Sequence, residues 1–379
     1  MRDVVIAGYA RSPFHLAGKG ALARIRPDDL AAQVIRGLIE RTGIDPADIE
    51  DIILGCAFPE GEQGLNVARL IGLLADLPLS VGGMTVNRFC GSSMSAIHIA
   101  MGQIQIGAGE AFVCAGVESM SRVPMMGFNP LPNPTLAGKN AGAYMGMGET
   151  AENVATRYQI TRGEQEAFAV SSQRKAAAAQ QGGRLADEIV PIETKAGTVS
   201  EDGTLRPDTS AEGLAGLKPA FDQNGSVTAG TSSPLTDGAS AVLVTSEDYA
   251  RAHGLPILAR IKAVGIAGCA PEVMGIGPVG ASLKALARAG VDAGALDVIE
   301  LNEAFASQAL ACMRDLGLDQ AKVNVDGGAI ALGHPLGATG ARIVGKAAAI
   351  LKRDGGRYAL ATQCIGGGQG IATVLEAAE

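Results

Sequence analysis

The sequence predicts an α/β protein in which helices cover a mostly parallel β-sheet. Two observations support this fold class: short apolar runs alternate with stretches of helical periodicity near both ends of the chain, and these two end regions resemble each other. The 379 residues suffice for sizeable buried cores, since 47% of them are hydrophobic and only 18% are charged. The 52 glycines are too dispersed for a fibrous repeat and indicate many tight turns.

The N-terminal region contains the first series of alternating elements. Its apolar runs predict strands, and its amphipathic stretches predict helices. We expect strands at residues 4–8, 51–55, 84–88 and 111–116, and helices at residues 28–42, 65–74 and 90–106. The first helix is expected to end at Gly43.

The C-terminal region repeats this plan. We expect strands at residues 257–265, 296–301, 322–325 and 357–363, and helices at residues 279–289, 303–316 and 335–353. Residues 43–52 overlay residues 290–299 without a gap, and the same register places Ala57-Phe58 over Ala304-Phe305. This similarity indicates an internal duplication, although two unrelated strand–helix–strand units can also look alike.

The chain therefore divides into two halves with an insertion between them. Residues 1–120 are expected to form the N-terminal half, which is completed by about residues 237–256, and residues 257–379 the C-terminal half. Residues 121–236 are rich in Gly, Pro, Asn, Ser and Met, with one helical piece near residues 150–181. A segment of this length inside a compact protein is more often functional than a linker.

Composition excludes several function classes. The net charge of −8 argues against a nucleic-acid-binding protein. The six cysteines form no Cys-x-x-Cys pair, and no cysteine–histidine cluster has the spacing of a zinc site, so we expect no metal. So few cysteines in a long chain, with no secretory or transit pattern and no unbroken apolar run, favour a cytoplasmic protein without a membrane span.

Cys90 is the first candidate catalytic residue. It lies at a predicted strand-to-helix junction, where unpaired backbone N–H groups and the helix dipole stabilise a thiolate. The alternative is a small buried cysteine in a core, which is common for a free thiol. The position alone leaves both interpretations open.

Three further polar residues follow predicted strands, as Cys90 does. His334 precedes a helix that begins near Pro335, and it could accept a proton from a thiol or cap the helix. Cys364 opens a glycine-rich turn and could donate a proton to a carbanion, or be a buried thiol. Asn302 could orient a water or donate to an oxyanion. Because open α/β sheets place their sites at the ends of strands, the shared placement favours one joint site.

These motifs resemble the thiolase family, the acetyl-CoA acyltransferases, nearly from end to end. The family fold has two repeated βαβαβαββ halves in a five-layered αβαβα arrangement with an inserted loop domain, in agreement with the duplication. The matching segments are residues 87–94, 116–121, 150–153, 227–230, 237–239, 274–278, 302–305, 327–337 and 364–370.

The resemblance implies a role for each catalytic candidate. Cys90 is the nucleophile that accepts the acyl group, and His334 activates it and helps to stabilise an oxyanion of the thioester. Cys364 moves the proton at the α-carbon of acetyl-CoA. Asn302 holds a water that completes one oxyanion hole, and the N–H groups of Cys90 and Gly366 form the second. The reaction is ping-pong through an acyl-cysteine.

The resemblance also implies that residues 121–236 are a loop domain for coenzyme A (CoA) binding. CoA thioesters are then substrates, and no cofactor is bound permanently. Arg206 matches the position beside the adenine, although it could be an ordinary solvated arginine. The other expected CoA contacts are Ser233 with the pantetheine arm, Met147 and Met274 as apolar walls beside the acyl thioester, and Ala304 and Phe305.

Three departures from the short-chain biosynthetic members resemble the degradative 3-ketoacyl-CoA thiolases of bacterial β-oxidation. Gly146 stands where biosynthetic members usually carry a histidine, residues 90–94 read Cys-Gly-Ser-Ser-Met, and residues 231–233 read Thr-Ser-Ser. The expected function is therefore cleavage of 3-ketoacyl-CoA with CoA. The alternatives are a biosynthetic acetyl-CoA C-acetyltransferase and a non-catalytic CoA- or lipid-binding relative.

The family also implies how the chain assembles. Thiolase sheets pair edge to edge, so we expect a homodimer or homotetramer, with a hydratase/dehydrogenase subunit as a further possible partner.

Overall fold

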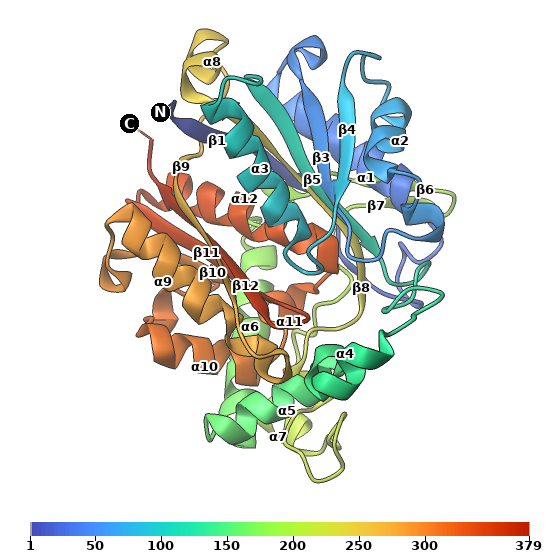
Figure 1. Cartoon of the computed structure of the whole chain (residues 1–379), viewed down its shortest axis with the longest axis vertical. Helices are drawn as coiled ribbons and strands as arrows, with labels where there is room; N and C mark the ends of the chain where they lie inside the picture. Colours follow the sequence, from blue (N-terminus) through green and yellow to red (C-terminus); the bar gives the residue numbers. More distant parts are fainter. Residues whose placement is uncertain (1, 379) are drawn as a thin grey trace.

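A computed structural model describes residues 2–378 and has the α/β fold expected from the sequence (Figure 1). The chain begins with β1, and most of the expected elements are present within a few residues of their expected bounds. The elements before the insertion are β1 (Val4–Arg11), β2 (His15–Leu16), α1 (Pro27–Thr42), β3 (Asp51–Gly55), α2 (Val67–Leu74), β4 (Gly82–Val86), α3 (Ser92–Gln105) and β5 (Ala111–Ser119).

The insertion and the C-terminal region supply the remaining elements. In the insertion these are α4 (Pro134–Lys139), α5 (Met147–Arg157), α6 (Arg162–Gln181), β6 (Ile192–Thr194), β7 (Gly197–Val199) and α7 (Ala211–Ala215). After it come β8 (Thr236–Ser246), α8 (Glu247–Ala252), β9 (Ala259–Gly268), α9 (Gly277–Ala289), β10 (Val298–Leu301), α10 (Ala306–Leu316), α11 (Ala329–Leu332), α12 (Leu336–Asp354), β11 (Tyr358–Ile365) and β12 (Gln369–Glu376).

One continuous path of hydrogen-bonded strands contains two sheets. The strand order is β10-β11-β12-β9-β1-β8-β5-β3-β4, with β2 paired to β8. Between β9 and β1 only two residue pairs are in register, Val5 with Arg260 and Ile6 with Ala259. The path therefore separates at this point into an N-terminal and a C-terminal sheet.

Helices and sheets alternate in five layers. One buried core lies between α1, α2 and the N-terminal sheet, and another lies between the C-terminal sheet and α9 and α10. The third core contains residues of α3 and α12 together with residues of both sheets, so these two helices form the central layer. Figure 1 shows α12 between the two groups of strands.

The expectation of a mostly parallel sheet is wrong. The pairs β3–β4, β3–β5 and β10–β11 are parallel, but the other pairs along the path are antiparallel. The link between β11 and β12 shows the reason, since a connection this short can join only antiparallel strands. Gly367 and Gly368 turn the chain there with φ values of +82° and +86°, which glycine adopts without strain.

Two local expectations also differ from the structure. Residues 322–325 form no strand but a single bridge between Ile299 and Val323. Asn324 has φ +47°, and its side chain forms hydrogen bonds with both the N–H and the carbonyl of Leu301. The chain therefore turns away from β10 at this point. Residues 150–181 form two helices rather than one, because Thr161 caps α6 in a capping box with Glu164.

Close packing joins the first turns of the two central helices. A Cβ atom on Gly340 of α12 would lie 2.2 Å from the backbone nitrogen of Met94 in α3. A Cβ atom on Gly116 of β5 would lie 2.2 Å from the carbonyl oxygen of Gly337. The segments that precede α3 and α12, which carry Cys90 and His334, are therefore brought to the same end of the molecule.

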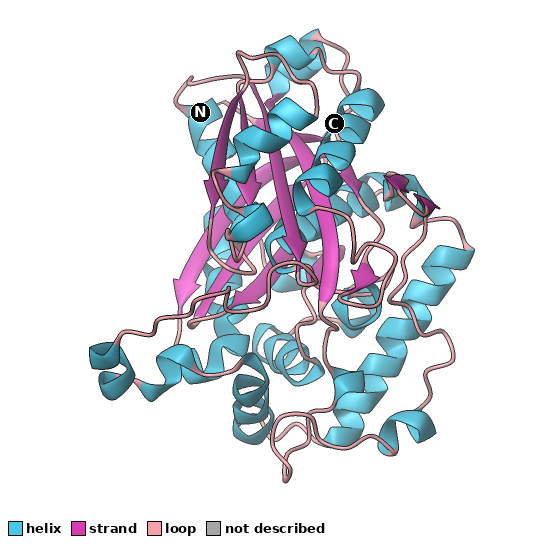
Figure 2. Ribbon diagram, turned by 90° about the vertical axis from the view of Figure 1, so that its right-hand side faces the viewer, coloured by secondary structure: helices cyan, strands magenta, loops and turns pink. Residues whose placement is uncertain are grey.

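The helices α4, α5 and α7 of the insertion lie below the sheets in Figure 1, and the helices below the sheets are seen from the side in Figure 2. The strands β6 and β7 of the insertion lie instead beside α1 and α2, and a buried ion cluster ties this part of the insertion to β1. The Arg11 guanidinium donates to Glu188 at 2.7 Å and to both carboxylate oxygens of Asp202 at 2.7 and 2.8 Å. All three side chains are buried, so each charge depends on its partner for compensation. Within residues 2–378, no helix is long and apolar enough to cross a membrane.

Candidate active site

Cys90 lies in a strained turn between β4 and α3. The residue before it, Phe89, has φ +43°, which is costly for an aromatic residue and is held by the surrounding hydrogen bonds. The Phe89 N–H donates to the Asn87 side chain at 2.8 Å, and the Ser92 hydroxyl donates to the Phe89 carbonyl at 2.6 Å. The Gln363 side chain of β11 donates to the Cys90 carbonyl. These contacts hold the thiol at the junction of the two halves.

The expectation that the helix start lowers the pKa of Cys90 is wrong for this structure. Burial raises the pKa of the thiol to about 12, and the charge of Glu118 adds to this effect. Hydrogen bonds from the N–H groups of Gly366 and of Cys90 itself oppose the shift without cancelling it. Desolvation therefore outweighs the helix dipole, and Cys90 needs a base to become a nucleophile.

His334 has the tautomer and the protonation state required of such a base. Its Nδ1 atom lies 2.6 Å from the Thr339 hydroxyl, and its Nε2 atom lies 3.4 Å from the Asn302 amide nitrogen. Because that amide nitrogen can only donate, Nε2 is the acceptor and Nδ1 carries the proton. Burial, helped by the charge of Arg342, lowers the pKa of His334 to about 3. The imidazole is thus neutral, and its unprotonated Nε2 atom faces the Asn302 amide.

We expect His334 to remain neutral from pH 8 to pH 5. The folded pKa lies below the ordinary value of 6.5, so the unfolded chain binds this proton more readily. The His334 contribution to folding stability is therefore complete above pH 6.5 and is lost as the pH falls from there toward 3. NMR of the histidine Cε1 protons, assigned with His334→Asn, tests this. A His334 resonance that titrates near pH 6.5 would contradict the burial argument.

Cys364 lies in β11, opposite Gly370 of β12, and is fully buried. Burial raises its pKa well above the ordinary thiol value, and the nearby Cys90 adds to the shift. The Cys364 thiol is therefore much less acidic than an ordinary thiol, because it lies in an apolar cluster. The cluster contains Ala151, Val227, Met274, Ala304, Phe305 and, partly buried, Met147.

Asn302 and Gly366 lie beside these groups. The buried Oδ1 atom of Asn302 has no hydrogen-bond partner within residues 2–378, while its amide nitrogen faces His334. Gly366 packs beside Met147 and Phe89, since a Cβ atom there would lie 3.4 Å from the Met147 sulfur and 3.7 Å from the Phe89 ring. The buried Oδ1 atom of Asn302 therefore requires a hydrogen-bonding partner such as a water.

Two of the expected pantetheine and thioester contacts are joined by hydrogen bonds. The Ser233 backbone N–H and hydroxyl both donate to the Ala304 carbonyl, at 3.0 and 3.1 Å. Ser232 forms a bridge with Phe305. The segment before β8 is thereby fixed against the turn that follows Asn302.

Arg206 lies apart from the catalytic cluster. It is exposed at the rim of a cavity of about 530 Å³ that Ser232, Pro234 and Ala229 also line. The cavity is thus adjacent to Ser233, and its volume suits part of an extended ligand. Of the expected site residues, Arg206 is the one that the structure does not place beside the apolar cluster around Cys364.

Glu118 is a site residue whose role the sequence did not reveal. It is fully buried in β5 and accepts hydrogen bonds from the backbone N–H groups of Ala57, Phe58 and Gly337. It therefore connects the loop after β3 with the first turn of α12, close enough to Cys90 to affect its pKa. The position of Glu118 within an apolar strand could have indicated this role, since a buried carboxylate requires hydrogen-bonding partners.

The structure brings Cys90, His334, Cys364, Asn302 and Gly366 to one region, with an apolar wall on one side. This arrangement suits covalent acyl transfer by a thiol, with a neutral base and N–H groups directed at the reacting centre. Within residues 2–378, no group of three or more His, Cys, Asp or Glu side chains is arranged to hold a metal ion.

Comparisons with known proteins agree with this chemistry. Residues 4–248 match the model of the thiolase N-terminal domain, and residues 255–377 match that of the thiolase C-terminal domain. The chain is 46% identical to a 3-ketoacyl-CoA thiolase of Bacillus subtilis over 99% of this chain and 100% of the relative. It is 49% identical to one of Pseudoalteromonas translucida, with 99% of each chain covered. The crystal structure of human mitochondrial 3-ketoacyl-CoA thiolase in complex with CoA is similar at a TM-score of 0.92 and 38% identity, covering 100% of this chain and 98% of that one.

Proposed function

Because this chain belongs to the thiolase family, we propose that it is a 3-ketoacyl-CoA thiolase that cleaves 3-ketoacyl-CoA with CoA. The observation that carries this proposal is the grouping of a thiol, a neutral imidazole and a second thiol beside an apolar cluster. A non-catalytic relative would have no need of this set. The bacterial relatives named above share the proposed activity.

The first half-reaction forms an acyl-enzyme. The Nε2 atom of His334 takes the proton from Cys90, and the sulfur attacks the 3-keto carbon of the substrate. The N–H groups of Cys90 and Gly366, which already point at the sulfur, stabilise the oxyanion on that carbon. The C2–C3 bond then breaks, which leaves the acyl group on Cys90 and a carbanion on the departing acetyl-CoA.

Cys364, His334 and Asn302 act on the departing acetyl-CoA carbanion. Cys364 gives its proton to the α-carbon, and the protonated His334 with a water on Asn302 stabilises the enolate oxygen. The sulfur of the incoming CoA then attacks the acyl-cysteine. The proton of the CoA thiol passes to the Cys364 thiolate, and His334 returns its proton to the departing Cys90 sulfur, so all three groups regain their starting state. The unpartnered Oδ1 atom of Asn302 supports the water, and the high pKa of Cys364 supports its role as an acid for a strongly basic carbanion.

The proposed path of the CoA moiety follows the segment before β8. The pantetheine arm would pass Ser233 and the walls made by Met147, Met274 and Phe305. The adenine would lie near Arg206, where the cavity of about 530 Å³ opens. Arg206 is exposed, so its guanidinium is free to stack on a base or to face a phosphate.

The acyl chain length tests the degradative assignment. Gly146 is exposed at the start of α5, and a Cβ atom there would meet nothing closer than the Glu149 side chain at 3.8 Å. A histidine would extend into this space and shorten the acyl pocket. We expect kcat/KM for 3-ketooctanoyl-CoA to be at least as high as for acetoacetyl-CoA, because each buried methylene adds up to about 0.8 kcal/mol.

The variant Gly146→His should lower the ratio of these two kcat/KM values by about tenfold or more. Gly163→His is the matched control, since a Cβ atom at Gly163 meets nothing within 4 Å and this residue lies in α6. A wild-type preference for acetoacetyl-CoA would instead assign the chain to the biosynthetic acetyl-CoA C-acetyltransferases.

The edge strand β4 supports the proposal of a homo-oligomer. It ends the strand order, and its outer backbone groups pair with no other strand of the described chain. Nearby Leu65 and Leu79 are 88% and 79% exposed, which is unusual for leucines of a monomer. Light scattering at micromolar concentration should give at least twice the mass of one chain, and a monomer would contradict this.

A further inference from the structure

A buried carboxylate directly follows Asn302, at the point where the chain leaves β10. This residue, Glu303, is 1% exposed. Its carboxylate accepts hydrogen bonds from the Ser172 hydroxyl at 2.6 Å, from the Asn324 amide at 2.7 Å and from the Ile330 N–H at 3.1 Å. These donors belong to α6 of the insertion, to the segment before α11 and to α11 itself, so one side chain joins three segments to the turn after β10.

The Asn324 side chain holds the chain on both sides of Asn302. Its amide oxygen accepts from the Leu301 N–H at 2.9 Å, and its amide nitrogen donates both to the Leu301 carbonyl at 2.8 Å and to Glu303. Both ends of this amide are used, so the amide cannot rotate without losing hydrogen bonds. A carboxylate at position 303 accepts from every donor around it, whereas a glutamine there would direct its own N–H groups at those of either Asn324 or Ile330.

The segment that leads to His334 packs directly on this carboxylate. A Cβ atom on Gly328 would lie 2.1 Å from the Cδ atom of Glu303, so only a glycine fits at this position. The Gly328 N–H donates to the Ser172 hydroxyl at 3.2 Å. The helix α11 begins at the next residue and ends two residues before His334. Glu303 therefore fixes the Asn302 turn and the approach to His334 relative to each other.

The same contacts extend to the cavity of about 530 Å³. Gln173, which follows Ser172 in α6, donates to the Ile330 carbonyl at 3.2 Å and accepts from the Arg206 backbone N–H at 2.9 Å. Gln173, Ile330 and Arg206 all line that cavity. The insertion is thus joined to the turn at Asn302 by a continuous set of hydrogen bonds.

We propose, on the premise of the thiolase activity proposed above, that Glu303 is a positioning residue that holds the Asn302 amide against His334. The Asn302 amide nitrogen lies 3.4 Å from the His334 Nε2 atom, which is near the upper limit of a hydrogen bond, so a small displacement of the turn breaks the contact. Burial raises the pKa of Glu303, and the hydrogen bonds from Ser172, Asn324 and Ile330 oppose this because they stabilise the ionised form. The helix α6 of the insertion then helps to place the groups that stabilise the enolate, in addition to any role in CoA binding.

The variant Glu303→Gln should lower kcat for thiolysis by about 10²-fold, the scale of one lost oxyanion donor. Exchange of labelled CoA into acetyl-CoA should fall by less than about fivefold, because the N–H groups of Cys90 and Gly366 stabilise the oxyanion of that step. In the double variant Glu303→Gln/Asn302→Ala, thiolysis should be no more than about threefold slower than in Asn302→Ala alone, since both changes remove one function. Equal loss of thiolysis and exchange, or additive losses in the double variant, would overturn the proposal.

A second measurement does not depend on turnover. The chain has four histidines, so the nitrogen NMR spectrum of histidine-labelled protein is simple to assign. Glu303→Gln should move the His334 Nε2 resonance toward its position in Asn302→Ala, because both variants remove the same hydrogen bond. An unchanged resonance would overturn the proposal even in an active enzyme. A wild type that catalyses neither thiolysis nor exchange would instead refute the proposed function, and the NMR comparison would still decide the role of Glu303.

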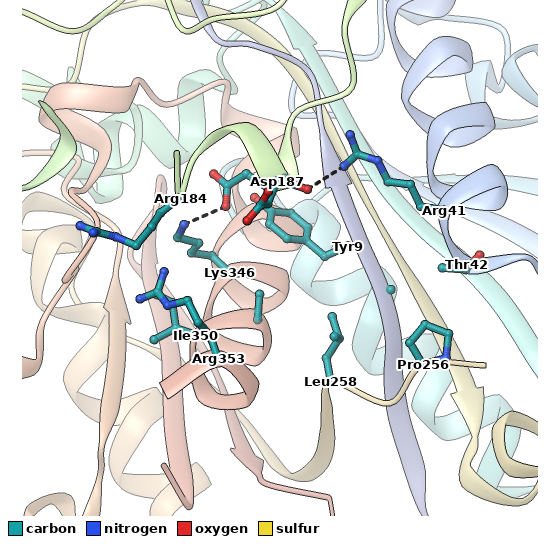
Figure 3. A pocket seen from close by; sticks show the side chains of 13 residues that line it. Tyr9, Arg41, Thr42, Arg184, Asp187, Pro256, Leu258, Lys346, Ile350 and Arg353 are labelled. Carbon is teal, nitrogen blue, oxygen red and sulfur yellow. Dashed lines mark hydrogen bonds and ion pairs between the residues drawn. The ribbon is translucent and has the colours of Figure 1, made fainter. Parts of the chain in front are cut away.

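Two further variants separate positioning from a general loss of stability. Ser172→Ala removes one donor to Glu303 without placing two donors together, and it should lower kcat for thiolysis about tenfold. Glu188→Gln is the matched control, since Glu188 is another buried carboxylate but lines a separate cavity of about 310 Å³ (Figure 3). Lys346 keeps its pair with Asp326 in this variant, and the ratio of thiolysis to exchange should not change. Circular dichroism melts establish that each variant is folded. Should Glu303→Gln not fold, Ser172→Ala decides the question by the same ratio and the same resonance.

Discussion

Cys90→Ala is expected to lower kcat for thiolysis by at least about 10⁴-fold, because no other group can hold the acyl chain between the two half-reactions. Cys364 cannot replace Cys90, since this second thiol is fully buried in the apolar cluster and its pKa is raised well above the ordinary thiol value. The N–H groups of Cys90 and Gly366, which stabilise the oxyanion, also point at the Cys90 sulfur.

The measurement is an acid quench of enzyme mixed with 3-ketoacyl-CoA, followed by mass spectrometry of the peptides. Wild-type enzyme should carry the acyl group on Cys90, and the alanine variant should carry none. Cys114→Ala is a suitable control, because Cys114 is a buried cysteine of β5 outside the site. An acyl group found on Cys364 but never on Cys90 would remove the nucleophile assignment.

Cys364→Ala is expected to separate the two kinds of chemistry that the enzyme performs. Thiolysis should fall by about 10³-fold or more, since cleavage requires a proton for the α-carbon of acetyl-CoA. Exchange of labelled CoA into acetyl-CoA should fall by less than about tenfold, since acyl transfer to and from Cys90 moves no proton at carbon.

Both rates are measured on the same preparation, with Cys312→Ala as the control for removal of a buried thiol. Cys312 is fully buried in α10 and its sulfur contacts the Gly275 carbonyl at 3.2 Å, so its loss probes packing rather than catalysis. Equal loss of thiolysis and exchange in Cys364→Ala would contradict the division of labour.

Local signals in the sequence predicted most element positions. The helix expected at residues 28–42 is α1 (Pro27–Thr42), because Pro27 favours the first turn and Gly43 takes the left-handed conformation that ends it. Strand direction was not predictable in this way. Strand–helix alternation suggested parallel pairing, but β8 enters the sheet antiparallel to both of its neighbours after the insertion, and no local pattern encodes that pairing.

The candidate site shows the same limit. The residue types and their positions after strands pointed to Cys90, His334 and Cys364, but their protonation depends on what packs around them. Burial raises the pKa of Cys90 to about 12, against the expectation from the helix start, and it lowers the pKa of His334 to about 3. The Asn302 amide sets the imidazole tautomer, and the hydroxyl of Thr339, five residues after His334 on α12, accepts the Nδ1 proton; only the folded chain reveals these two contacts.

The place of β8 between β1 and β5 also determines when the N-terminal sheet can be completed during synthesis. Residues 4–11 pair mainly with residues 240–246, so β1 leaves the ribosome long before its main partner exists. At typical translation rates the delay is on the order of tens of seconds. During this time the apolar strand β1 has an unpaired edge that a chaperone would have to protect. Shortening the insertion would reduce this delay, and the nascent chain would then spend less time exposed to aggregation.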